Sequence, residues 1–284
     1  HAACLLGAAK ILSENRDAFS GKVRLVFQPG EEIGKGAKPF VAAGVLEGAE
    51  RVFGLHTAYD LEAGTVGLKP GINNAAVDHF RIRVHGKSTH VSTPHLGVDA
   101  LYIASQIVVA VQGLVTRRTS PTEPVIIGIG KLNAGTTYNA VAAFAEMEGT
   151  TRTISQESRD RVRAQVSETA QSIAALYGGT AEVEWTDFAA ALVNDPQVCE
   201  EAARVVDELL GAGHVVTDRE LSLSGDNFAE FELYKPGAYA YLGTGNPDLP
   251  HTMITNHNGG FDVDENALVT GAGLYVGYTV ARLG

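Results

Sequence analysis

The order of strand-like and helix-like segments constrains the fold of this chain more than any single motif does. Between residues 78 and 192 the apolar patterns predict a strand, a helix, two strands, a helix and a strand. This β-α-β-β-α-β succession is the split unit of ferredoxin-like α+β domains. On both sides of it short strands alternate with helices, a pattern that is typical of a mostly parallel sheet. The sequence therefore predicts an α/β domain that is interrupted by an inserted α+β domain.

The expected domain boundaries follow from this pattern. Residues 1–77 and 193–284 are expected to form one discontinuous domain, with residues 78–192 inserted into it. The helices predicted in the discontinuous domain cover residues 2–14, 35–43, 198–210 and 266–282, and its strands cover 22–27, 51–56 and 237–242. The inserted domain is expected to have strands at 78–85, 124–132, 143–150 and 181–188, and helices at 98–116 and 158–177.

Composition excludes some classes of function. The chain has 284 residues, of which 45% are hydrophobic, so it can bury two domain cores. Its formal net charge of -11 argues against a nucleic-acid partner, because phosphate binding needs a positive surface. No apolar run is expected to reach the roughly 18 residues of a membrane span, so no membrane role is predicted. Cys4 and Cys199 predict no disulfide framework, which favours a cytoplasmic location.

The start of the chain suggests that sequence is missing. His1 is followed at once by a helical apolar pattern, and no signal-peptide pattern is present. We therefore expect this chain to be a fragment of a longer protein.

Two adjacent glutamates form the most informative motif. Glu31 and Glu32 lie in the stretch FQPGEEIGKG, just after a predicted strand and a Pro-Gly break. Open α/β sheets bind ligands at the carboxyl ends of their strands. Adjacent side chains point in different directions, so one carboxylate could bind a metal while the other handles a proton. The alternative is a solvated acidic loop that opens a helix, where carboxylates are also favoured.

Two histidines could complete such a site. His56 ends a short predicted strand in the stretch GLHT, and His257 lies in the glycine-rich stretch NHNGGFD before the last helix. A neutral imidazole is a common metal ligand. Each histidine taken alone is more often an ordinary core or surface residue.

Taken together, these stretches resemble a known family. The chain is similar to the di-metal aminoacylase/carboxypeptidase family of peptidases, and most of all to its amidohydrolase branch, which includes hippurate hydrolases and indole-acetyl-amino-acid hydrolases. The matching stretches follow the family's order over almost the whole chain: HAACLLGAAK, FQPGEEIGKGA, GLHT, HGKSTHVSTPHLGVDA, GTTRT, PGAYAYLGTGN and HNGGFDVDENAL.

The resemblance implies an activity and roles for particular residues. It implies hydrolysis of the amide bond of an N-acyl amino acid or short peptide, with two divalent ions, zinc or manganese, as cofactors. Glu31 would be the general base that takes a proton from a metal-bridging water. The metal ligands would be Glu32, His56 and His257. The family's other two ligands come from a Cys-Gly-His-Asp stretch that would precede His1, so we expect the chain alone to bind metal poorly and to be inactive.

The resemblance also assigns roles within the inserted domain, which corresponds to the family's lid and dimerisation domain. His90 would stabilise the oxyanion, in the same subunit or in a partner's site if the protein is a homodimer. Asn139 would orient the substrate. Arg152 could clamp a carboxylate with two hydrogen bonds, although a strand-end arginine taken alone is more often a surface ion-pairing residue.

The chain departs from the family's usual sequence at three places. It has Asn-Ala-Val-Ala from Asn139, Gly-Asp-Asn-Phe from Gly225 and Asn-Gly after His257, where the family often has Asn-Val-Ile-Pro, Ser-Glu-Asp-Phe and a proline. These departures bear on substrate preference. One alternative remains open: a degenerate homologue that binds an amide or carboxylate ligand without turnover. The presence of Glu31 argues against it, because a binding protein needs no base.

Overall fold

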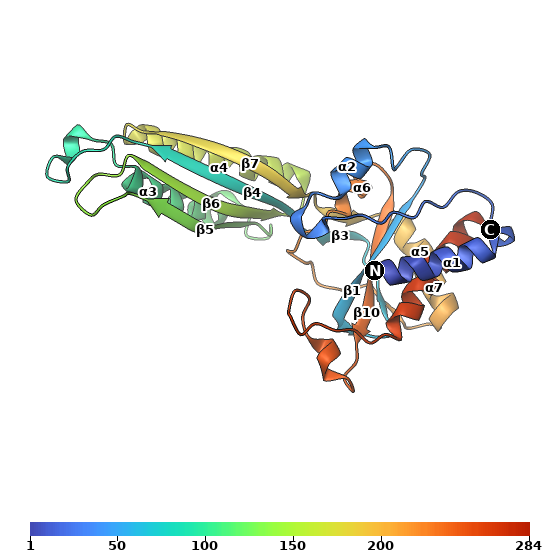
Figure 1. The fold of residues 1–284 in the computed structure, drawn as a ribbon. Helices are drawn as coiled ribbons and strands as arrows, with labels where there is room; N and C mark the ends of the chain where they lie inside the picture. Colours follow the sequence, from blue (N-terminus) through green and yellow to red (C-terminus); the bar gives the residue numbers. More distant parts are fainter. The chain divides into compact units, whose positions relative to one another are not determined.

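The computed structural model describes all residues 1–284, which form two compact units (Figure 1). Unit 1 comprises His1–Asn73, Leu192–Leu221 and Asn227–Gly284, and unit 2 comprises Asn74–Ala191 and Ser222–Asp226. The short segment Ser222–Asp226 therefore belongs with unit 2, which the sequence pattern does not indicate.

Unit 1 contains a mixed sheet with the strand order β1-β10-β2-β9. Its strands are β1 (Val52–Glu62), β2 (Val66–Gly67), β9 (Val215–Val216) and β10 (Gly237–Gly245). The pairs β1–β10 and β2–β9 are parallel, whereas β10–β2 is antiparallel. The expected α/β fold with parallel strands is confirmed, but the two-residue strands β2 and β9 are too short to give a periodicity signal. Strands β3 (Gly71–Asn74) and β8 (Leu192–Asn194) form a separate two-stranded sheet.

Three long helices cover one face of the β1–β10 pair (Figure 1). They are α1 (Ala2–Glu14), α5 (Pro196–Leu210) and α7 (Ala267–Leu283), and the prediction of each is confirmed within two residues. They bury an apolar core that includes Leu55 of β1, Leu242 of β10 and Leu274 of α7. Helix α5 begins where Asp195 accepts hydrogen bonds from two backbone amides, with proline as its first residue. The short helices α2 (Ala37–Ala42) and α6 (Ala229–Glu232) contact each other.

The strand predicted over residues 22–27 is wrong. This segment is extended but belongs to neither a strand nor a helix. Its β-branched residues favour a strand locally, yet no neighbouring strand hydrogen-bonds to it. Val23 and Phe27 are consequently exposed by 38% and 46%. Strand formation depends on a partner, which local sequence does not reveal.

Unit 2 has the predicted β-α-β-β-α-β order. Its strands β4 (Ala76–His85), β5 (Ile126–Ala134), β6 (Phe144–Thr153) and β7 (Thr180–Ala189) form an antiparallel sheet ordered β5-β6-β4-β7. Helices α3 (Ala100–Gly113) and α4 (Gln156–Leu176) lie together on one face of this sheet (Figure 1). The predicted strands and helices are thereby confirmed, with shifts of at most three residues at their ends.

Helix α3 has a largely apolar composition. Together with the π-helical turn Leu114–Arg118 it is long and apolar enough to cross a membrane, by length and composition alone. The stretch is not an uninterrupted apolar run, because it contains Gln112, Arg117 and Arg118. The structure explains the hydropathy, because Ile103, Ile107 and Val111 pack into the core of unit 2.

Candidate functional site

The two adjacent glutamates begin a tight turn in unit 1. The 3₁₀ turn Glu31–Ile33 lies between Gly30 and Gly34, which both have left-handed backbone angles, with φ of 73° and 66°. Glycine adopts this conformation without the steric cost of a Cβ atom. Within the turn Glu31 is half-buried, whereas the side chain of Glu32 is 72% exposed. The turn therefore presents the two carboxylates in different environments.

The structure brings Glu32 next to His257. Its carboxylate Oε2 lies 3.5 Å from the imidazole Nδ1 of His257, although the two residues are far apart in sequence. His257 is the one non-glycine residue with a positive φ, at 63°. A residue held in this sparsely populated region points to a functional constraint. Two of the three residues expected to be metal ligands are thus neighbours.

The Glu32–His257 pair fits a divalent metal ion. An oxygen and a nitrogen ligand each lie about 2.1 Å from zinc, so two ligands of a tetrahedral ion are about 3.4 Å apart. The observed 3.5 Å is close to this value and longer than a good hydrogen bond. The donor set of one carboxylate and one imidazole is also suited to zinc or manganese.

His56 has the tautomer that a ligand needs. Its Nδ1 lies 2.8 Å from the carbonyl oxygen of Thr57, which can only accept, so Nδ1 carries the proton. The lone pair of Nε2 is then available, as in many metal-binding histidines. His1 supports this arrangement, because its Nε2 accepts a hydrogen bond from the Thr57 amide at 3.0 Å and its ring lies 4.6 Å from that of His56. No sequence motif indicates this role for His1.

A complete metal cluster is not assembled. No group of three or more His, Cys, Asp or Glu side chains is arranged to hold a metal ion. His56 is therefore not part of the Glu32–His257 pair. Its ring lies among aromatic neighbours on the sheet, about 6 Å from those of Tyr239 and Tyr241, while the other two residues come from surface turns.

In unit 2 the structure brings His90 and Asn139 together. His90 forms an isolated β-bridge with Ala140, and the backbone carbonyl of Asn139 accepts a hydrogen bond from the Val91 amide. The imidazole Nδ1 of His90 is 2.7 Å from the Ser92 hydroxyl. The carboxamide oxygen of Asn139 accepts a hydrogen bond from Thr137. Both residues therefore belong to one small cluster of loops.

Arg152 lies on β6 with most of its hydrogen-bonding capacity unused. Its Nη1 donates one hydrogen bond, 3.2 Å long, to the carbonyl oxygen of Leu223. No carboxylate forms a salt bridge with it, and burial lowers the pKa of its guanidinium, because desolvation disfavours the charged form. A partly desolvated guanidinium with free donors is suited to a carboxylate ligand.

Arg152 and the His90–Asn139 cluster lie at opposite ends of unit 2. Arg152 pairs with Val77, whereas Phe144 at the other end of β6 pairs with His85. At about 3.4 Å per residue, this part of the strand is about 27 Å long. The cluster lies beyond Phe144, so it cannot contact the same small molecule as Arg152 within one copy of unit 2.

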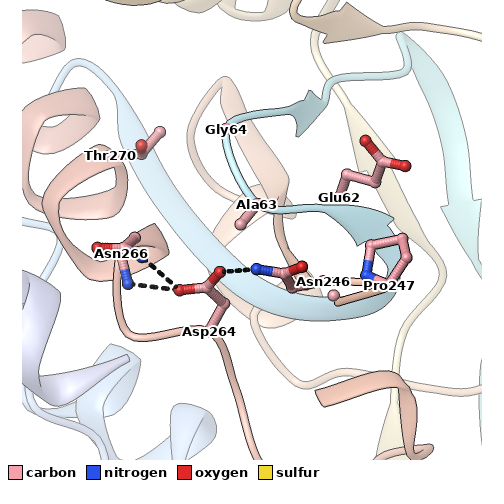
Figure 2. Close-up of a pocket in the computed structure, with 9 residues that line it drawn as sticks. Glu62, Ala63, Gly64, Asn246, Pro247, Asp264, Asn266 and Thr270 are labelled. Carbon is pink, nitrogen blue, oxygen red and sulfur yellow. Dashed lines mark hydrogen bonds between the residues drawn. The ribbon is translucent and has the colours of Figure 1, made fainter. Parts of the chain in front are cut away.

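A separate pocket in unit 1 contains none of the expected site residues. It has a volume of about 370 Å³ and lies where β1 and β10 end, beside the start of α7 (Figure 2). Asp264 in its wall accepts hydrogen bonds from Asn246 and Asn266, which lower the pKa of its carboxyl group. Glu62, also in the wall, is six residues beyond His56, or about 20 Å along the strand. We conclude that the polar groups of this pocket stabilise the start of α7 and do not form the functional site.

Comparison with known proteins identifies a family. The model of the family described as "Peptidase family M20/M25/M40" matches residues 1–280 of this chain. The N-acetyl-L-cysteine deacetylase of Bacillus subtilis is 38% identical over 95% of this chain and 62% of its own length. Thermostable carboxypeptidase 1 of Saccharolobus solfataricus is 37% identical, over 96% of this chain and 69% of its own. The chain thus spans about two thirds of the length of these relatives.

Solved structures agree with this assignment. The YXEP protein of Bacillus subtilis, described as a dinuclear metal binding peptidase, has a TM-score of 0.82 and 32% identity. The match covers 99% of this chain and 70% of that protein. The related proteins are hydrolases, so the comparisons do not bear out the expectation that this chain is inactive.

Proposed function

Because the chain belongs to peptidase family M20/M25/M40, we propose that it is a metal-dependent amidohydrolase that cleaves the amide bond of an N-acyl amino acid or a short peptide. The observation that carries this proposal is the turn in which Glu31 precedes Glu32, whose carboxylate lies 3.5 Å from His257. In this proposal Glu31 acts as a general base beside the ligands Glu32 and His257.

The substrate class is drawn from the names of the relatives. One is a deacetylase of N-acetyl-L-cysteine, and another is a carboxypeptidase. A relative from Arabidopsis thaliana with 30% identity is an IAA-amino acid hydrolase. These names share an amide bond with an amino acid on one side, so we assign this chain a substrate with an amide next to a free carboxylate.

The chain's own residues would divide the chemistry between them. Two divalent ions, zinc or manganese, would lower the pKa of a water molecule and polarise the amide carbonyl when bound. Glu32, His56 and His257 are the residues that would hold them. Glu31 would accept the proton of the attacking water and deliver it to the leaving amine, which requires a carboxylate near the metals but not bound to them.

Unit 2 would act as the lid that recognises the substrate. Arg152 would hold the substrate carboxylate, because its half-buried guanidinium has donors that no protein carboxylate uses. Asn139 would orient the substrate, and His90 would donate a hydrogen bond to the oxyanion.

We further propose that the protein is a homodimer and that one subunit supplies His90 and Asn139 to the site of the other. The support is the part of β6 between Arg152 and Phe144, about 27 Å long, beyond which this pair lies in unit 2. A substrate of the size of an N-acyl amino acid cannot span that distance. Two copies allow both groups to act on one substrate.

Exposed apolar side chains distributed along unit 2 are suited to this contact. It includes Leu101 and Val109 on α3, exposed by 48% and 70%, and Tyr138, exposed by 95%. Strand β5 is an edge strand of the sheet and also exposes Ile126. A second copy could pair along this edge and cover these side chains. Analytical ultracentrifugation should give a dimer for the wild type and a monomer for Val109→Glu, whereas Leu209→Glu, at an exposed position of unit 1, should remain dimeric.

Glu31→Gln tests the proposed reaction most directly. The purified protein, supplied with Mn²⁺ or Zn²⁺, is assayed for amine release on a panel of N-acyl amino acids. We expect Glu31→Gln to lower kcat by at least about 100-fold, within the range that general base catalysis contributes. Glu208→Gln, at an exposed position of α5, should retain wild-type turnover.

The same assay tests the alternative of a binding protein without turnover. If the wild type binds an N-acyl amino acid by calorimetry but releases no amine with either metal, the amidohydrolase proposal is wrong. Equal turnover of the wild type and Glu31→Gln would remove Glu31 from the role of general base.

A further inference from the structure

The segment that leads to the two glutamates has little backbone support. No backbone hydrogen bond connects residues 21–29 to a strand or a helix. The turn itself is closed internally, since the Lys35 amide donates to the Gly30 carbonyl and the Gly34 amide to the Glu31 carbonyl. These bonds define the shape of the turn but not its place in unit 1. A side-chain contact must therefore anchor it.

Two side chains of this segment make such contacts: Arg24 donates to the carbonyl oxygens of Val45 and Glu47, and Gln28 makes the contact that lies next to the turn. Its Nε2 donates a hydrogen bond of 2.7 Å to the Oδ1 atom of Asn227, which is almost completely buried, with 1% exposure. The backbone carbonyl of Asn227 accepts a hydrogen bond from the Glu230 amide in α6, so the acceptor is held in place. Gln28 therefore joins the glutamate turn to a fixed part of unit 1.

Close packing against Gly36 keeps the Gln28 side chain in this position. Gly36 lies so close that a Cβ atom there would be 2.0 Å from the Pro29 carbonyl oxygen and 2.5 Å from Nε2 of Gln28. The residues that flank the turn, Pro29 before it and Gly36 after it, thus lie next to each other and to the Gln28 side chain. A displacement of Gln28 would move the turn as a whole.

We propose that Gln28 and Asn227 are positioning residues whose hydrogen bond sets the location of Glu31 and Glu32. The consequence for catalysis rests on the proposed function, in which Glu31 is the base and Glu32 a ligand. A displacement of about 1 Å in a catalytic group can cost about 100-fold in rate. Loss of this bond should therefore lower kcat by about 10- to 100-fold and leave KM nearly unchanged, because the proposed function gives neither residue a part in substrate binding.

The chemistry of the pair predicts which substitutions preserve it. Asn227→Asp retains an acceptor for the Gln28 amide and should keep wild-type kcat, whereas Asn227→Leu removes the acceptor. Nδ2 of Asn227 is buried and has no hydrogen-bond partner. In Gln28→Glu the Asn227 carboxamide can rotate and donate from Nδ2, so this variant should be tolerated. The double variant Gln28→Glu with Asn227→Asp places two carboxylates together and should lose the contact.

Hydrogen–deuterium exchange measures positioning without relying on activity. In Gln28→Leu and Asn227→Leu, the amides of residues 28–36 should exchange faster than in the wild type, and in Asn227→Asp they should not. Gln197→Leu is the matched control, since Gln197 makes an exposed side-chain hydrogen bond to Glu201 on α5. It should change neither exchange nor kcat.

The outcomes separate this inference from the proposed function. Unchanged exchange in Gln28→Leu would overturn the inference, and so would faster exchange with wild-type kcat in an active protein. If the wild type has no amidase activity but the exchange pattern follows the expected order, the anchoring is supported and the proposed function fails.

Discussion

Replacing Arg159 by leucine should destabilise unit 2 strongly, because it leaves a buried carboxylate without its partner. Asp78 on β4 is 1% exposed and accepts two hydrogen bonds from Arg159 on α4, of 2.9 Å and 2.6 Å. Removing one member of a buried ion pair costs about 3–5 kcal/mol. Arg163, whose Nη1 is 3.9 Å from Asp78, retains part of the attraction, so we expect about 3 kcal/mol.

Urea unfolding followed by tryptophan fluorescence measures this change. Trp185 is the single tryptophan and packs against the core of unit 2, so its signal reports that unit. With an m-value of about 2 kcal/mol per M, the midpoint should fall by about 1.5 M.

Two further variants make the test specific. Arg161→Leu removes a partly exposed ion pair with Glu123 and should cost at most about 1 kcal/mol. Asp78→Leu combined with Arg159→Leu should recover much of the lost stability, because it removes both buried charges. If Arg159→Leu moves the midpoint no further than Arg161→Leu does, the reasoning about the buried pair is refuted.

Three other properties can be tested in the same way. Hydrogen bonds from a lysine and a histidine lower the pKa of Glu148 to about 2, so its stabilisation is full above about pH 4.5 and is lost as the pH falls through 2; the urea midpoint of Glu148→Gln should therefore depend less on pH in this window. Both cysteines are buried, and burial raises the pKa of Cys199 to about 11, so a disulfide reagent at pH 8 should label neither thiol until urea unfolds the protein. A Cβ atom at Gly149 would lie 2.3 Å from a phenylalanine ring, so Gly149→Ala should cost about 1–3 kcal/mol by urea unfolding, whereas Gly130→Ala, with nothing within 4 Å, should cost less.

Periodicity in the sequence was sufficient to predict the helices and strands whose own residues show a regular apolar pattern. The helices α4 and α5 each bury one stripe of side chains and begin at a capping residue, Ser155 and Asp195. Strand β4 alternates between buried and more exposed residues over most of its length. These signals are local, so the sequence alone determined both the elements and their order in unit 2.

The sequence alone could not show which segments would pair with a neighbouring strand. Residues 22–27 have the composition of a strand but form none, because sheet formation requires hydrogen bonds from a neighbouring strand. Strands β2 and β9, with two residues each, exist only because the main sheet of unit 1 provides such neighbours.

The candidate site, too, was only partly predictable from the sequence. The motif stretches alone named Glu31, Glu32, His56 and His257 as candidates, because residue types at the ends of strands and in glycine-rich turns carry chemistry wherever they fold. Only the tertiary structure decided that Glu32 and His257 are neighbours, that His56 is not part of that pair, and that Gln28 anchors the turn. Proximity between residues distant in sequence is set by packing of the whole unit, and no local pattern encodes it.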